Sequence, residues 1–149
     1  MDMKKFLLAV VVAYVLLITT TYFIHGVWLG AFYRNYMDSW RPLEQQAAKA
    51  WILLAGRLLY TVMFAWVYLR GLEQKSWIGQ GIRYGGVVWL LVSVPDILST
   101  YVLFRVPYRL ALLWMSIALM QTVMMGLVVA YFLRPAAPPV EAGADARKA

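Results

Sequence analysis

Four long apolar runs, separated by short polar segments, dominate the chain. The runs cover about residues 6–32, 50–69, 84–104 and 110–133. A helix needs about 20 apolar residues to cross a membrane, and each run reaches that length. The pattern therefore predicts an all-α membrane protein, with a bundle of four transmembrane helices as a single domain over residues 1–134.

The composition of the 149 residues agrees with a membrane protein. Hydrophobic residues make up 63% and charged residues 14%, whereas soluble domains have about 45–50% and about 25%. Four spans with short loops leave no room for a separate soluble domain. The last segment, residues 135–149, combines proline, alanine and mixed charge without aromatic residues, and we expect it to be a disordered tail.

The first apolar run begins like a signal peptide, because Lys4 and Lys5 precede a stretch that stays apolar up to Ile18. The apolar character resumes after Thr19–Thr21, and no cleavage site of the small-x-small type ends the run. We therefore expect this run to remain in the protein as the first span.

The loops between the runs are short. Pro42 is well placed to begin the helix of the second span early, because proline fits the first helical turn. The third loop, Arg105–Arg109, is so short that the third and fourth spans must be antiparallel neighbours.

Glycines occur in two groups. Gly26 and Gly30 form a G-x-x-x-G step in the first span, which predicts close packing of another helix there. Gly79, Gly81 and Gly85 have a spacing one residue different from the dinucleotide-binding fingerprint. That fingerprint requires a preceding strand, which this apolar pattern does not provide, so we interpret these glycines as a flexible start to the third span.

Positive charges are distributed unequally between the two ends of the predicted spans. One side carries eight lysines and arginines, including Lys4 and Lys5, and the other carries five. This bias predicts that both termini lie in the cytoplasm. The net charge of +7 lies mostly at span ends, which favours membrane lipids with anionic headgroups as its partner over nucleic acid.

Each predicted span has a polar side chain well inside its length: His25, Arg57, Asp96 and Gln121. At about 1.5 Å of rise per residue, all four would lie roughly 10–18 Å below the same membrane surface. A charged side chain at that depth costs about 2.5–3.5 kcal/mol and normally has a partner or a function. We therefore expect the four to form one intramembrane network or ligand pocket.

Two interpretations of this network stay open. In the structural one, Arg57 and Asp96 form an ion pair that neutralises both charges, and His25 and Gln121 complete the hydrogen bonding. In the functional one, the residues line a pocket, open to the outer side, that binds a small ligand or passes a proton. Pro95, directly before Asp96, removes a backbone hydrogen bond and should kink the third span, with consequences for helix packing.

The residue types present give little support to catalytic or metal chemistry. The chain has no cysteine and one histidine, too few for an ordinary metal site, so no metal or cofactor is expected. Asp96 is the single acid within the predicted spans, which excludes paired-carboxylate chemistry there. The methionines of the fourth span suit the filling of core gaps better than copper binding. We therefore do not expect an enzyme.

Several short stretches carry a resemblance to a group of known proteins. They are Ile24-His25-Gly26 with Leu29-Gly30, Trp40-Arg41-Pro42, the segment from Gly79 to Gly85, Pro95, Tyr101 and Pro107. From about Lys4 to Arg134, the chain resembles small bacterial four-span integral membrane proteins of unassigned function. The resemblance implies a four-helix fold in a bacterial inner membrane, and it carries no catalytic residues.

These observations predict a non-enzymatic membrane protein. Short loops and aromatic-rich spans, with 7 tryptophans and 10 tyrosines in the chain, favour an accessory or structural subunit that packs against another membrane protein or against itself. The alternative is a small transporter or proton-coupled binding protein that uses a pocket of His25, Arg57 and Asp96. A membrane enzyme or a haem protein is a third possibility.

Overall fold

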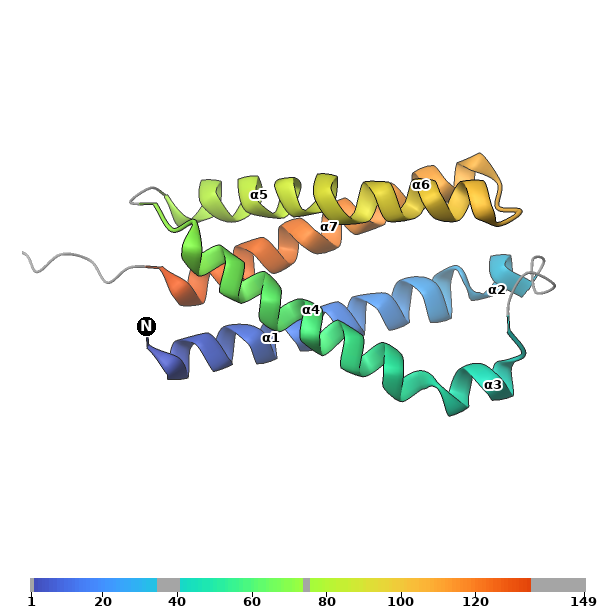
Figure 1. The fold of residues 1–149 in the computed structure, drawn as a ribbon, viewed down its shortest axis with the longest axis horizontal. Helices are drawn as coiled ribbons and strands as arrows, with labels where there is room; N and C mark the ends of the chain where they lie inside the picture. The colour runs from blue at the N-terminus through green and yellow to red at the C-terminus, as the bar shows by residue number, and fades with distance from the viewer. Residues whose placement is uncertain (1, 35–40, 74–75, 135–149) are drawn as a thin grey trace, which may run out of the picture.

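The computed structural model describes residues 2–34, 41–73 and 76–134, and every regular element in these ranges is a helix. Four helices are long and apolar enough to cross a membrane: Met3–Trp28, Ala50–Arg70, Trp77–Leu103 and Tyr108–Leu133. This confirms the predicted fold class, an all-α membrane protein with four spans (Figure 1). The expected tail, residues 135–149, lies outside the described residues.

The four spans are built from the following elements. The first span is α1 (Met3–Thr21) continued by a π-helical segment, η1 (Tyr22–Trp28), and α2 (Gly30–Tyr33) follows it. The short helix α3 (Leu43–Ala48) precedes the second span, α4 (Ala50–Arg70). The third span is α5 (Trp77–Val88), a second π-helical segment, η3 (Trp89–Ser93), and α6 (Val94–Leu103). The fourth span is the single helix α7 (Tyr108–Leu133).

Two helix starts follow directly from local sequence. The side chain of Asp2 accepts hydrogen bonds from the backbone N–H groups of Lys4 and Lys5, at 3.0 and 3.4 Å, and so caps α1. Pro42 immediately precedes α3, as expected for a helix that begins there, but the backbone at Lys49 (φ −106°, ψ 3°) separates α3 from α4.

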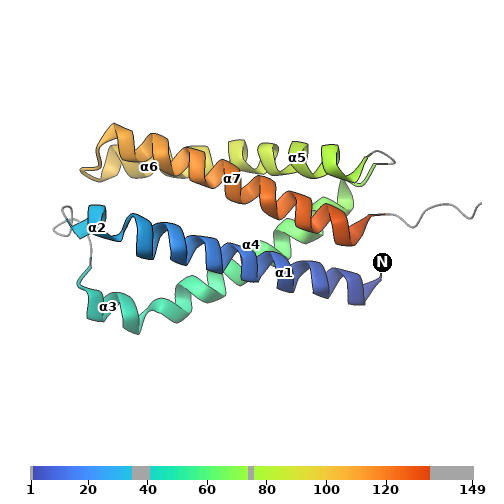
Figure 2. The same ribbon diagram turned by 180° about the vertical axis from the view of Figure 1, so that it is seen from behind.

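Helix α7 forms the centre of the bundle. It contacts α5 and α6 along one side and α1 along the other, while α4 crosses the bundle obliquely (Figure 1, Figure 2). The N-terminal end of α1, the α4–α5 connection and the C-terminal end of α7 lie together at one end. Helices α2 and α3 and the α6–α7 connection lie at the other end.

The contact between α5 and α7 is a direct approach of two backbones. A Cβ atom added to Gly85 would lie 2.5 Å from the carbonyl oxygen of Thr122, and one added to Gly81 would lie 2.8 Å from that of Gly126. Only glycine fits at these positions, because any side chain would push the helices apart. The prediction of a flexible start to the third span is therefore wrong, since the helix already begins at Trp77.

The other glycine pair does not mediate a helix contact. A Cβ on Gly26 would have only the ring of Tyr22 within 4 Å, and one on Gly30 only the carbonyl oxygen of His25, so no described residue of another span approaches either position. The expected close packing at Gly26 and Gly30 is absent among the described residues, because Gly26 is exposed in the π-helical segment η1 and Gly30 lies beyond the span, in α2.

Pro95 lies in the first turn of α6, directly after the π-helical segment η3. Proline has no backbone N–H and cannot continue an α-helical hydrogen-bond ladder. The wider π turn changes the hydrogen-bond register at this point, and the span continues as one helical rod from Trp77 to Leu103. The structure thus combines the proline with a local change of helix type.

The apolar core lies toward the end of the bundle that holds the N-terminus. Small residues in this core are completely buried and allow α1, α4 and α7 to approach one another: Ala9, Ala13, Ala65 and Ala130. Phe64, Tyr68 and Met125 fill the space between them. The ring of Tyr84 from α5 meets Phe64 and Tyr68 edge to face, at centroid distances of 4.7 and 5.2 Å.

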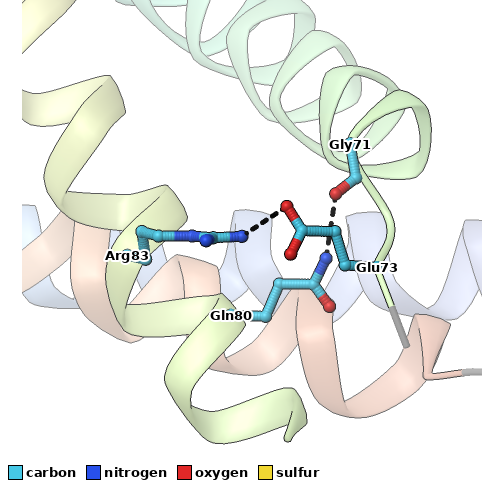
Figure 3. Close-up of polar contacts among 4 residues, drawn as sticks. All are labelled: Gly71, Glu73, Gln80 and Arg83. Carbon is cyan, nitrogen blue, oxygen red and sulfur yellow. Dashed lines mark hydrogen bonds and ion pairs between the residues drawn. The ribbon is translucent and has the colours of Figure 1, made fainter. Parts of the chain in front are cut away.

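The connection between α4 and α5 is held by polar contacts (Figure 3). The side-chain amide of Gln80 donates to the carbonyl oxygen of Gly71 at 2.9 Å, where α4 ends. Arg83 forms an ion pair with Glu73, also at 2.9 Å. Gln80 is buried, whereas both members of the ion pair are exposed. These contacts fix the exit of the second span against the start of the third.

Helix α4 is packed at one end only. Its buried residues, Thr61, Phe64, Ala65 and Tyr68, all belong to the C-terminal half. The N-terminal half diverges from the bundle together with α3 (Figure 1) and exposes large apolar side chains such as Trp51 and Leu53. The helices are therefore closely packed at the end with the N-terminus and more open at the other.

Candidate functional site

A cavity of about 250 Å³ lies where α4 begins to diverge from the bundle. All four spans contribute to its wall, which combines polar and apolar side chains: Leu17, Thr21, His25, Arg57, Tyr60, Val92, Ser93, Ala118, Gln121, Thr122 and Met125. Met125 also belongs to the core cluster, so the cavity begins where the core ends. His25, Arg57 and Gln121, which the sequence placed at one depth, line this single space.

Both π-helical segments border the cavity. His25 belongs to η1, and Val92 and Ser93 belong to η3. A π turn adds about one residue to a helical turn, is rare in proteins, and is frequently found at functional sites. Two such segments, on different spans, both contribute residues to this one cavity. Their position favours the cavity as the functional site.

Arg57 is the one positively charged residue in the cavity wall. It is half-buried, and its guanidinium group forms no ion pair or hydrogen bond with any residue that the structure describes. His25 of η1 and Tyr14 of α1 lie within electrostatic reach of it. Tyr14 itself donates to the carbonyl oxygen of Leu54, at 3.2 Å, and so links α1 to α4 beside the arginine.

A chain of side-chain hydrogen bonds fixes His25. Its Nδ1 atom lies 2.6 Å from the hydroxyl group of Tyr33, and the indole N–H of Trp114 donates to the same hydroxyl oxygen at 2.8 Å. Burial raises the pKa of the Tyr33 phenol above its ordinary value, and the hydrogen bond from Trp114 opposes this shift. Which of the two groups donates in the hydrogen bond between His25 and Tyr33 depends on the tautomer of the imidazole.

Gln121 connects α7 to α1. Its side-chain amide nitrogen donates to the hydroxyl oxygens of Thr20 and Thr21, at 3.0 and 3.2 Å. Thr20 in turn donates to the backbone of its own helix, at 2.8 Å to Leu16. With both amide protons used, the side-chain carbonyl oxygen of Gln121 is left as an acceptor.

Asp96 does not line the cavity. It is exposed, and it forms no ion pair with Arg57 or with any other residue in the described ranges. Asp96 follows Ser93 by three residues, which places it one turn nearer the open end of the bundle. The structure thus brings together three of the four predicted polar residues and leaves the carboxylate outside.

Comparison of the chain with family models, with curated proteins and with solved structures finds no match. The resemblance to bacterial four-span proteins therefore stays a prediction. Function has to be inferred from the geometry of the site alone.

Several residues of the cavity wall are not among the four polar residues predicted to form the network. Tyr60 follows Arg57 by three residues and so shares its helix face, a signal that the spacing contains. Thr21 was noted only as part of a polar break, although it lies four residues before His25 on the same face. The described residues contain no group of three or more histidines, cysteines or acids that could hold a metal ion.

Proposed function

We propose that this protein binds a small ligand inside the membrane, in the cavity between its four spans. The observation that carries the proposal is the half-buried Arg57, which faces a cavity at membrane depth without an acidic partner among the described residues. An isolated charge in a spanning helix is costly and marks a binding or transport site by default. A purely structural network would have paired it.

Two further features support a binding role. The cavity wall is built by all four spans, so a bound molecule would contact each of them. The hydrogen bonds of His25 and Gln121 hold these side chains in place, as expected for a site prepared before a ligand arrives. The N-terminal half of α4 has no buried residue, which leaves a route between α4 and the bundle by which a ligand could enter and leave.

We further propose a bacterial inner membrane as the location, with both termini in the cytoplasm. At the end of the bundle that holds the N-terminus, Arg70 stacks on Trp66 at 4.7 Å and Arg134 stacks on Tyr131 at 4.6 Å. Aromatic and cationic side chains together suit the headgroup layer, and cations are enriched on the cytoplasmic side. The cavity would then open toward the outer half of the membrane.

Native mass spectrometry after gentle detergent extraction tests the binding proposal. The protein should carry a bound small molecule. Ala118→Trp, which fills the cavity from α7, should remove that molecule. Leu119→Trp is the matched control, because the neighbouring side chain is exposed and outside the cavity wall and should leave the molecule bound. An unoccupied wild-type protein, or equal occupancy in both variants, would refute the proposal.

A second candidate function is that of an accessory subunit, and one observation favours it. The N-terminal half of α4 has no buried residue, and Trp51 and Leu59 are 68% and 64% exposed. A helix from a larger membrane protein, or from a second copy, would find an unoccupied apolar surface there. The same mass spectrum distinguishes the two functions, because a subunit adds the mass of a polypeptide and a ligand does not.

A further inference from the structure

The polar groups of the cavity wall that lack a protein partner are mostly hydrogen-bond donors. Arg57 offers five N–H groups, and the hydroxyl groups of Tyr60 and Ser93 make no hydrogen bond with any described residue. Thr21 accepts from Gln121 and keeps its own proton. The side-chain carbonyl of Gln121 is the one amide acceptor in the wall, and no carboxylate is present. The hydroxyl groups can also accept, but Arg57 can only donate, so a ligand that satisfies Arg57 brings acceptors.

The charge of the wall points in the same direction. Arg57 is cationic at every physiological pH, and the nearby His25 cannot neutralise it because a histidine is neutral or positive. Asp96, the acid expected to do so, lies outside the wall. The cavity therefore has a net positive charge in the described structure, and its natural complement is an anion.

The size and the apolar part of the wall restrict the anion further. The volume of about 250 Å³ equals roughly eight water molecules at about 30 Å³ each, enough for one phosphate or carboxylate group with a few attached carbon atoms. Leu17, Val92 and Met125 supply an apolar side to the cavity, and Val92 is also 48% exposed on the outside of the bundle. A ligand can therefore extend from the polar wall toward the lipid past η3.

We propose that the ligand of this cavity carries an oxyanion, a phosphate or carboxylate group attached to an apolar body, and that Arg57 binds the oxyanion. This inference rests on the proposed binding function and specifies its ligand class. Tyr60 and Ser93 donate further hydrogen bonds to the oxyanion, and the apolar body leaves the cavity beside Val92. An anionic membrane lipid and a free water-soluble anion share this chemistry.

The test compares the binding of two lipids with equal acyl chains to delipidated protein, by native mass spectrometry. Phosphatidylglycerol should bind about tenfold or more tightly than the diacylglycerol with the same acyl chains, which lacks the phosphate, because a hydrogen bond to a charged group contributes about 1.5–3 kcal/mol and 1.4 kcal/mol corresponds to tenfold. Arg57→Gln should abolish the preference, and Arg57→Lys should keep part of it. In a parallel measurement, inorganic phosphate is added to the delipidated protein and thermal unfolding is followed.

Arg70→Gln is the matched control for a charge effect at the membrane surface. Arg70 lies on the same helix as Arg57 but stacks on Trp66 at the end of the span, outside the cavity wall. This variant should retain the preference for phosphatidylglycerol. Ala118→Trp is a second test variant, because it fills the cavity and leaves the charge of Arg57 in place. It should also lose the preference for phosphatidylglycerol.

Each outcome decides a specific question. A preference for phosphatidylglycerol that depends on Arg57 supports the inference with a lipid as the source of the oxyanion. Stabilisation by inorganic phosphate that depends on Arg57, without a lipid preference, supports it with a free anion as the source. A preference that survives unchanged in Arg57→Gln, or neither effect in wild type, overturns it. A bound molecule that is neutral and is lost in Ala118→Trp would overturn the ligand class and leave the binding function intact.

Discussion

The two sides of α7 are packed in opposite ways. On one side, α5 approaches so closely that Gly81 and Gly85 touch the backbone of α7 around Gly126. On the other side, α1 and α4 meet α7 through side chains, and the contact opens into a cavity where α4 diverges. Each side uses the residues suited to it, because backbone contact needs glycines and an open side can accommodate polar groups.

The two sides of α7 contribute differently to the stability of the fold and to the proposed binding site. In a membrane, helices gain little from leaving lipid, so close packing of small residues provides much of the attraction between them. The α5–α7 side has this packing where Gly81 and Gly85 meet Gly126. The α4 side has it only near Ala65, and Arg57 lies about two turns away, where the packing ends. We infer that the first side holds the fold together and that the second side tolerates the cost of a binding site.

The largest effect is expected where the backbones touch. Gly85→Ala should destabilise the protein by roughly 1–3 kcal/mol or more, because the added methyl group overlaps the backbone of Thr122 and overpacks the contact. Gly86→Ala is the matched control, since nothing lies within 4 Å of its added Cβ. It should be neutral or stabilising by about 0.5–1 kcal/mol through helix propensity. Thermal unfolding in detergent measures both, and equal stability of the two variants would contradict the contact.

The next largest effect has the opposite sign. Arg57→Leu should stabilise the delipidated protein by about 1–2 kcal/mol, part of the roughly 2.5–3.5 kcal/mol that a central arginine costs on insertion, because it removes a half-buried charge that no described residue pairs. Asp96→Leu should add independently, with a coupling energy below about 0.5 kcal/mol, as for residues that do not interact. A double-mutant cycle in chemical unfolding measures this coupling. A coupling of several kcal/mol would restore the ion pair that the sequence suggested.

A smaller effect separates two tyrosines in the same aromatic cluster. Tyr84→Phe should cost about 0.5–1.5 kcal/mol, because the hydroxyl group donates to the carbonyl oxygen of Phe64 at 2.6 Å. Tyr68→Phe should cost nothing or stabilise slightly, since its buried hydroxyl group has no hydrogen-bond partner in the described structure. Thermal unfolding of the two variants side by side checks the assignment. Equal losses would show that Tyr68 has a partner.

The smallest effect concerns the open side. Gln121→Leu should destabilise the protein by about 0.6 kcal/mol, the average for a hydrogen bond between membrane helices. It removes the donors to Thr20 and Thr21 that join α7 to α1. Gln121→Glu should be worse, because a carboxylate cannot donate to the two hydroxyl groups and adds a charge. Chemical unfolding of both variants measures the difference, and a stabilised Gln121→Leu would show that the contact contributes nothing.

Much of the fold could be predicted from the sequence, because spans are determined by apolar length alone. Helix rise converts sequence position into depth, and it put His25, Arg57 and Gln121 at one level; in the structure all three line one cavity. Depth does not give the direction in which a side chain points. The π turn of η3 adds about one residue per turn just before Asp96, so a face calculated with 3.6 residues per turn is rotated from there on.

The glycines show a second limit of prediction. Gly26 and Gly30 have the same spacing as Gly81 and Gly85, yet only the second pair packs against another helix. The distinguishing residue is Gly126, which lies in a different run and offers a backbone without a side chain in between. Such a contact needs small residues on both helices, so it cannot be predicted from the glycine spacing of one segment. The low helix propensity of glycine misled the prediction because tertiary packing outweighs it.

The central place of α7 has a consequence for how the protein is made. During synthesis, α7 follows the other three spans out of the ribosome, yet α1, α4 and α5 all pack against it. The first three spans are therefore inserted before the helix that they pack against is present. Until α7 is inserted, Arg57 lacks the cavity wall that α7 provides. We expect the short α6–α7 connection to place α7 directly beside α5, so that the insertion of α7 is also the step that brings the four described spans together.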